Sequence, residues 1–212
     1  MVSLNEIYDQ NLFITQSRIR DLCAQTPDVD YVKKEYAIHG GVWDGRNISP
    51  VWNFAGRART LVLGDSAEEL SRTKLALLHH VGRYRTIWST HVTGNSTGYV
   101  HALPIGLPYD RYYGFPFDVI GDVALVRKAY LGTALPASGN FRVLGSFEDR
   151  NSSDRPVVRA VLSSTARGLL RDFPVSVAGH LEYLQAIRTA GLVACPRGKG
   201  IDTYRLWETL YL

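Results

Sequence analysis

The residues best placed to do chemistry lie in a glycine-containing loop close to residue 200. Arg197, Gly198, Lys199 and Gly200 follow an apolar run and precede a segment of helical period. Glycines let a backbone approach a diphosphate closely, and the start of a helix presents unpaired N–H groups with a partial positive charge. A cationic side chain beside them neutralises phosphate oxygens. The loop therefore predicts a site for a nucleotide diphosphate.

Arg205 and Glu208 share one face of the helix that follows this loop, because they are three residues apart. A carboxylate in this place can accept hydrogen bonds from the two hydroxyls of a ribose. The same spacing also fits a polar strand-to-helix connection with an Arg/Glu pair on the surface. Spacing alone leaves both interpretations open.

Apolar runs that alternate with helix-period segments position this loop and predict an α/β fold. Gly191 is placed to end a helix, because glycine tolerates the left-handed conformation found after helix ends. Strand, helix, strand, helix, strand, glycine loop, helix is the order of a nucleotide-binding half of a doubly wound sheet. The expected strands cover residues 12–15, 60–64, 85–88, 140–145, 174–177 and 192–195, and the expected helices cover 70–81, 157–170, 180–190 and 204–212.

The C-terminal part of the chain also resembles a known signature. His180-Leu181-Glu182-Tyr183-Leu184 and the run Gly191–Leu212 are similar to the donor-site signature of exostosin-like glycosyltransferases, which fixes glycines, an acid, an arginine, a tryptophan and a second acid in one register. Lys199 departs from the asparagine often found there, and Tyr204 from a histidine. The resemblance implies two Rossmann-like halves with parallel sheets, as in GT-B enzymes. It also implies transfer of a sugar from a nucleotide-diphosphate donor to a glycan or other hydroxyl acceptor.

The resemblance further implies roles for single residues. Arg197 and the loop Gly198–Gly200 would face the diphosphate of a nucleotide sugar. Arg205 would stabilise the leaving diphosphate, and Glu208 would bind the ribose. Asp202 would either contact the sugar or cap the final helix. In this architecture arginines and a helix end replace a metal ion.

Shorter matches extend the resemblance along the chain. Asn140-Phe141 with Arg155 resembles the strand and helix start that open the donor half, and Leu103–Leu107 resembles the end of the first half. The signature helix is the last element, so we expect a second half that is incomplete because the chain is truncated; a compact relative that closes its sheet differently is the alternative. The expected parts are an acceptor-side half over 1–108, a linker region over 109–139 and a donor-binding half over 140–212.

Sugar transfer also needs a base for the acceptor hydroxyl, and Asp65 and His91 are the candidates. Asp65 or Ser66 also fits the cap of a helix that begins near residue 67, and the spacing favours that interpretation. The Gly64-Asp65-Ser66 block also resembles the nucleophile block of Gly-Asp-Ser esterases, with Ser66 attacking an acyl carbonyl. That family needs a histidine three residues after an aspartate, and the sequence contains no such pair. A catalytically silent sugar-nucleotide binding module is a third hypothesis.

Composition excludes several classes of protein. The 212 residues include 24 Lys and Arg against 20 Asp and Glu, a formal charge of +4, and the basic residues are scattered, so we expect no nucleic-acid partner. No apolar run reaches about 18 residues, and no leader is seen, which predicts a cytoplasmic protein without a transmembrane segment. Asp28-Val29-Asp30 matches a cation-binding triplet of another glycosyltransferase architecture, but its place after Pro27 favours a turn or strand start. We expect no metal and no cofactor beyond the donor.

Overall fold

The structure of the chain, a computed structural model, divides into two compact units. Unit 1 contains the described residues within 13–15, 106–198 and 203–212, and unit 2 contains those within 16–105 together with Asp202. The structure describes residues 13–33, 41–43, 48–50, 59–64, 72–80, 82–90, 92, 98–107, 120–137, 141–198 and 202–212.

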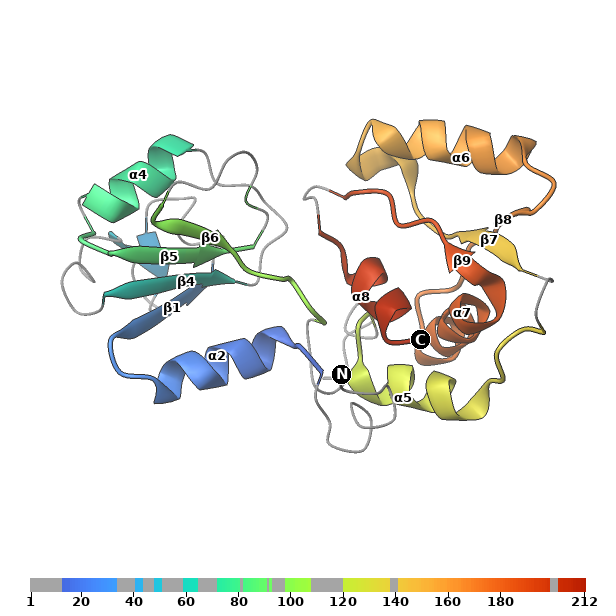
Figure 1. Cartoon of the computed structure of the whole chain (residues 1–212), viewed down its shortest axis with the longest axis horizontal. Helices are drawn as coiled ribbons and strands as arrows, with labels where there is room; N and C mark the ends of the chain where they lie inside the picture. Colours follow the sequence, from blue (N-terminus) through green and yellow to red (C-terminus); the bar gives the residue numbers. More distant parts are fainter. Residues whose placement is uncertain are drawn as a thin grey trace. The chain divides into compact units, whose positions relative to one another are not determined.

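Unit 2 is built on a parallel four-stranded sheet. Its described elements are α2 (Gln16–Gln25), β1 (Val29–Lys33), β2 (Gly41–Trp43), β3 (Ile48–Pro50), β4 (Thr60–Gly64), α4 (Arg72–His80), β5 (Thr86–Ser89) and β6 (Val100–Ala102). The sheet has the order β1-β4-β5-β6, and β2 pairs with β3 in a separate antiparallel ribbon. Helices α2 and α4 lie on opposite faces of the sheet (Figure 1).

The core of unit 2 lies between this sheet and α4. Leu61 and Leu63 of β4 alternate along the strand and are fully buried with leucines one turn apart on α4. Tyr84, just before β5, is buried in the same cluster, and its hydroxyl donates to Asp30 Oδ2 at 2.9 Å. The strand expected at 60–64 is confirmed.

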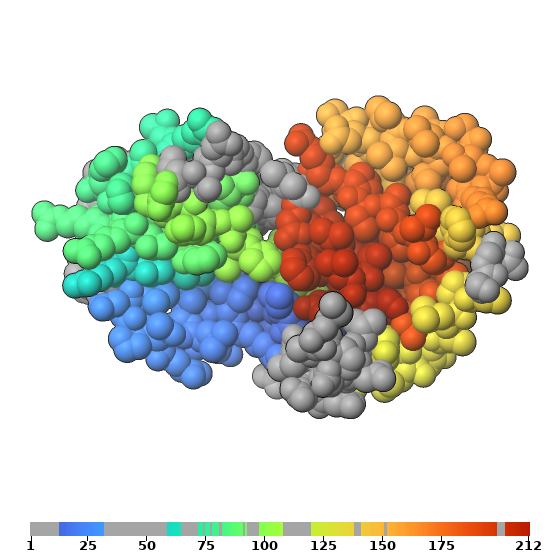
Figure 2. Space-filling view, viewed as in Figure 1, coloured from blue at the N-terminus to red at the C-terminus, as the bar shows by residue number. Residues whose placement is uncertain are grey.

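Unit 1 is built on three parallel strands. Its described elements are α5 (Val123–Gly132), β7 (Arg142–Gly145), the 3₁₀ turn η2 (Asp149–Asn151), α6 (Asp154–Ser164), β8 (Gly168–Leu170), α7 (Val177–Ala190), β9 (Gly191–Val193) and α8 (Tyr204–Leu210). The strand order is β8-β7-β9. Crossovers between parallel strands are right-handed, so two connections that run in opposite directions place α6 and α7 on opposite faces (Figure 1). Helix α5 packs against α7, and Figure 2 shows α6 in orange at the surface.

One apolar cluster holds unit 1 together. Leu144 of β7 is fully buried in a cluster with Leu184 and Ile187 of α7 and Val126 of α5. Gly191 ends α7 in the left-handed conformation, with φ of 80°. The helix end predicted from this glycine is confirmed.

The α/β fold with parallel sheets expected from the sequence is confirmed, and each of the two parallel sheets is compatible with a Rossmann-like half. The expected linker region, 109–139, includes α5, which packs in unit 1. The strand expected at 12–15 contributes only an isolated bridge between Thr15 and Leu107. Within the described ranges, no helix has the length and apolar character to cross a membrane.

Two other expected elements are wrong. Residues 168–170, expected as the end of a helix, form β8 because their backbone pairs with β7. The run 174–177, expected as a strand, leads into α7 instead. Ser176 caps that helix, since its Oγ accepts a hydrogen bond from Gly179 N at 3.1 Å.

Candidate functional site

The carboxyl ends of β7 and β9 meet at the topological switch point of unit 1. From β7 the chain crosses to β8 on one side, and from β8 it returns to β9 on the other side. Ligands of open parallel sheets bind outside the carboxyl ends of the strands at such a point. Two loops begin there, 146–148 after β7 and 194–198 after β9, which we call the switch-point loops. The described strands of the unit 2 sheet follow chain order and contain no such point.

Arg155, in the first turn of α6, joins the two switch-point loops. It is only 7% exposed, its Nε donates to the Arg197 carbonyl at 2.9 Å, and its Nη1 donates to the Glu148 carbonyl at 2.8 Å. A Cβ at Gly198 would lie 3.3 Å from Arg155 Nη2, so the glycine leaves room for the guanidinium. Main-chain acceptors therefore hold one cation between the loops.

Arg205, on α8, brings a second guanidinium to the same place. Its central carbon lies 5.8 Å from the ring centre of Phe147, in the first switch-point loop. Burial, and after it the positive charge of Arg205, lowers the pKa of Arg155. Among the described residues Arg205 forms no ion pair, and its buried Nε has no hydrogen-bond partner. The two cations repel each other, so an anion close to both is favoured.

Arg197 lies in the second switch-point loop, as predicted, and is more exposed. Its Nε is 3.2 Å from Asp154 Oδ2 and 3.4 Å from Ser152 Oγ. An exposed pair of this kind is weak, with a typical contribution of about 0–1 kcal/mol. Arg197 is therefore free to exchange Asp154 for a phosphate at little cost.

Among the predicted site residues that the structure describes, Glu208 is the most deeply buried, at 1% exposure. Its Oε1 accepts from Gly121 N at 2.7 Å and lies 2.8 Å from His180 Nε2, which donates to it. The carboxylate thus ties α8 to α7 and to the turn before α5. The ribose contact expected for Glu208 stays a prediction, and the observed contacts of its Oε1 are internal.

The sequence left two roles open for Asp202, a contact with the sugar and the cap of the final helix. Asp202 Oδ2 accepts from Ile105 N at 2.8 Å, within unit 2. Thr203 is the N-cap of α8, with its side chain accepting from Leu206 N. The cap expected at Asp202 therefore belongs to the next residue, and the sugar contact stays a prediction.

Several predicted residues lie outside the described part of the chain. These are Lys199 and Gly200 of the loop, the candidate bases Asp65 and His91, and the candidate nucleophile Ser66. Their roles stay predictions.

The aspartate triplet forms a turn and a strand start, as expected. Asp28 has a φ of 60° and precedes β1, which begins at Val29. Asp30 accepts the hydrogen bond from the Tyr84 hydroxyl. Within the ranges that the structure describes, no three His, Cys, Asp or Glu residues are grouped so that they could hold a metal ion.

Sequence reasoning does not identify Arg155 or His180 as site residues. One signal exists for Arg155. An arginine in the first turn of a helix lies near the positive end of the helix dipole, which is unfavourable, so its presence there indicates another role. No local signal exists for His180, because its contact with Glu208 spans 28 residues.

The arrangement at the switch point has the positive charge that an anion site needs. Two guanidinium groups, from Arg155 and Arg205, approach the carboxyl ends of two parallel strands. Such a pair can bind a diphosphate and stabilise the charge that develops on it when it leaves. No protein-family model matches the chain, and no curated protein is significantly similar to it.

Proposed function

We propose that the chain is a glycosyltransferase that binds a nucleotide-diphosphate sugar at the switch point of unit 1. The observation behind this proposal is the pair Arg155 and Arg205: burial and then the charge of Arg205 lower the pKa of Arg155, and among the described residues neither arginine has a carboxylate within ion-pair distance. The resemblance of residues 191–212 to the exostosin-like donor signature supports the same class.

In the proposed reaction the acceptor oxygen forms a bond to the anomeric carbon, and the bond from that carbon to the diphosphate breaks. The electron pair of the broken bond leaves with the diphosphate, whose added charge Arg155 and Arg205 stabilise. The acceptor proton goes to a base, for which Asp65 and His91 stay the candidates.

The first test measures nucleotide binding by calorimetry. UDP, GDP and ADP are titrated into the wild type and into Arg205→Gln, which removes the charge and keeps much of the side-chain length. A hydrogen bond to a charged group contributes about 1.5–3 kcal/mol, so we expect Arg205→Gln to weaken binding by about 10- to 100-fold.

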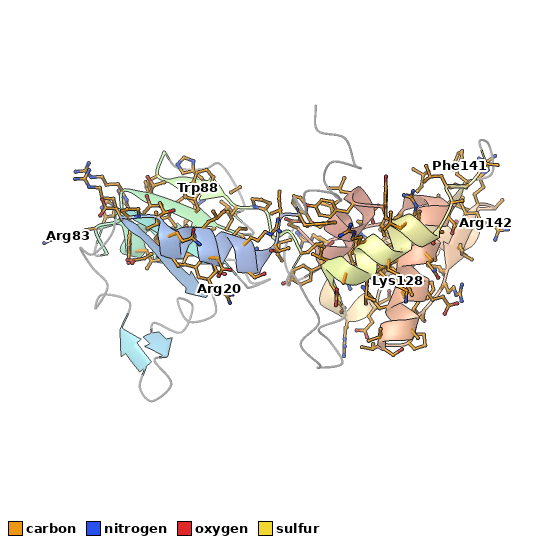
Figure 3. All side chains as sticks on the ribbon, turned by 90° about the horizontal axis from the view of Figure 1, so that it is seen from below. Arg20, Arg83, Trp88, Lys128, Phe141 and Arg142 are labelled. Carbon is orange, nitrogen blue, oxygen red and sulfur yellow. The ribbon has the colours of Figure 1, made fainter. Side chains whose placement is uncertain are left out.

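Arg142→Gln is the matched control. Arg142 is exposed at the amino end of β7, the end opposite to the site, where it lies next to Phe141 (Figure 3). This variant should bind like the wild type. If no nucleotide binds the wild type, or if both variants bind as well as it does, the assigned site is wrong.

The second test separates a transferase from a silent binding module. The wild type is incubated with UDP-, GDP- and ADP-sugars, and release of the free nucleotide is measured with water or simple glycans as acceptors. We expect release that Arg205→Gln slows. Binding without any release would support the module hypothesis instead.

A chelator distinguishes the arginine site from a metal site. Because arginines supply the positive charge in this proposal, EDTA should leave nucleotide binding and release unchanged. Loss of both on chelation, with recovery on adding Mn²⁺, would contradict it.

A further inference from the structure

Helices α7 and α8 face each other through two pairs of polar residues. His180 and Tyr183 are three residues apart on α7, and Arg205 and Glu208 are three residues apart on α8, so each pair lies on one helix face. The 2.8 Å contact between His180 and Glu208 fixes how the two faces meet. Arg205 is among the side chains that act directly on the Tyr183 hydroxyl, so Tyr183 lies beside Arg205.

Tyr183 and Arg205 have a feature that the contacting residues His180 and Glu208 lack. Tyr183 is 6% exposed, and its hydroxyl has no hydrogen-bond partner; the Nε of Arg205 is also buried without one. A buried polar group without a partner costs free energy, so a native structure keeps one only for a reason. Here two such groups, one able to accept and one able to donate, lie side by side.

Burial and the nearby carboxylate of Glu208 keep the Tyr183 hydroxyl neutral. Burial, and then the negative charge of Glu208, raises the pKa of Tyr183 well above its ordinary value, although Arg205 acts in the opposite direction. A neutral hydroxyl can accept the Nε–H of Arg205 without cancelling the charge of the guanidinium. A carboxylate in the same place would cancel it.

We propose that Tyr183 is a positioning residue for Arg205, and that its hydroxyl accepts the Arg205 Nε–H when a nucleoside diphosphate is bound. With Nε held by Tyr183, the two Nη groups form a fork that matches two phosphate oxygens. This inference rests on the proposed function, because it assigns Arg205 to the diphosphate.

The test uses Tyr183→Phe, which removes only the hydroxyl. Affinity for the nucleoside diphosphate that the wild type binds best among UDP, GDP and ADP should fall by about 3- to 10-fold, which is less than for Arg205→Gln because the hydroxyl acts on the phosphates only through Arg205. The melting temperature without ligand should stay equal or rise, because the hydroxyl has no partner there. Tyr130→Phe, on α5 with its ring against Arg188, is the matched control and should change nothing in binding.

A double-mutant cycle separates positioning from a general structural role. In the Arg205→Gln background, Tyr183→Phe should cause no further loss of affinity. An equal loss in both backgrounds, or a lower melting temperature for Tyr183→Phe, would overturn the inference.

The inference and the proposed function fail in different ways. If Arg205→Gln weakens binding and Tyr183→Phe binds like the wild type, Tyr183 has no positioning role and the proposed function stands. If the wild type binds none of the three nucleotides, both are wrong.

Discussion

Replacing Glu208 tests whether its carboxylate holds unit 1 together. In Glu208→Ala, Gly121 N and His180 Nε2 lose their acceptor and stay buried. Each hydrogen bond to a charged group is worth about 1.5–3 kcal/mol, so the expected loss is about 4 kcal/mol of unfolding free energy. The side chain is 1% exposed, so solvent does not screen this loss. For a chain of this size, about 2–4 °C per kcal/mol gives a melting temperature lower by about 8–16 °C.

Two further variants make the measurement specific. Glu208→Gln keeps an acceptor oxygen and the shape, and loses only the charge, so it should cost about 2 kcal/mol. Glu182→Ala, on α7, removes an exposed carboxylate that pairs with Arg171, and should cost less than about 1 kcal/mol.

Urea unfolding followed by circular dichroism gives the three free energies. A loss for Glu208→Ala no larger than that for Glu182→Ala would refute the reasoning. The ordering also decides how the ribose hypothesis is tested. Because Glu208→Ala lowers stability, only Glu208→Gln, measured on folded protein, can report on a ribose contact.

Two more outcomes are expected for stability. Burial and the hydrogen bond to Asp30 raise the pKa of Tyr84, so the folded state keeps the phenol protonated. The contribution of Tyr84 to the free energy of unfolding is therefore fully present below about pH 10, the pKa of an unfolded tyrosine, and it falls as pH rises above that value. Tyr84→Phe should flatten that alkaline decline in urea titrations between pH 8 and 11, and an unchanged decline would contradict this. Gly168→Ala should destabilise strongly, because its Cβ would lie 1.9 Å from the Leu162 carbonyl oxygen, whereas Gly132→Ala meets nothing within 4 Å and should be neutral, as melting curves can show.

Local patterns predicted the parts of the fold that depend on local physics. Leu61 and Leu63 alternate, as a strand with one buried face requires, and that strand is present. Gly191 ends a helix, as its tolerance of positive φ indicates.

Where two local patterns compete, the sequence could not decide. The run 174–177 contains two valines and is typical of a strand, but the Ser176 hydroxyl caps a helix start and fixes the outcome. Residues 168–170 fit the period of the preceding helix, and only pairing with β7 makes them a strand.

The candidate site shows the same division. The role of Arg197 was predicted from its place in a glycine loop and that of Arg205 from the resemblance to a donor signature, and both roles stay predictions. The bond from Arg155 to the Arg197 carbonyl spans 42 residues, so no local pattern indicates it.

The contact between residue 14 and residue 211 determines when unit 1 can finish folding during synthesis of the chain. Phe13 packs against the ring of Tyr211, and Ile14 N donates to the Tyr211 hydroxyl across 197 residues of chain. At a synthesis rate of about 5–20 residues per second, the ribosome needs about 10–40 s to make the second partner after the first. During that interval Phe13 has no native ring to pack against. Unit 1 therefore completes its core only late in translation, whereas the sheet of unit 2, made of residues 29–102, can form while synthesis continues.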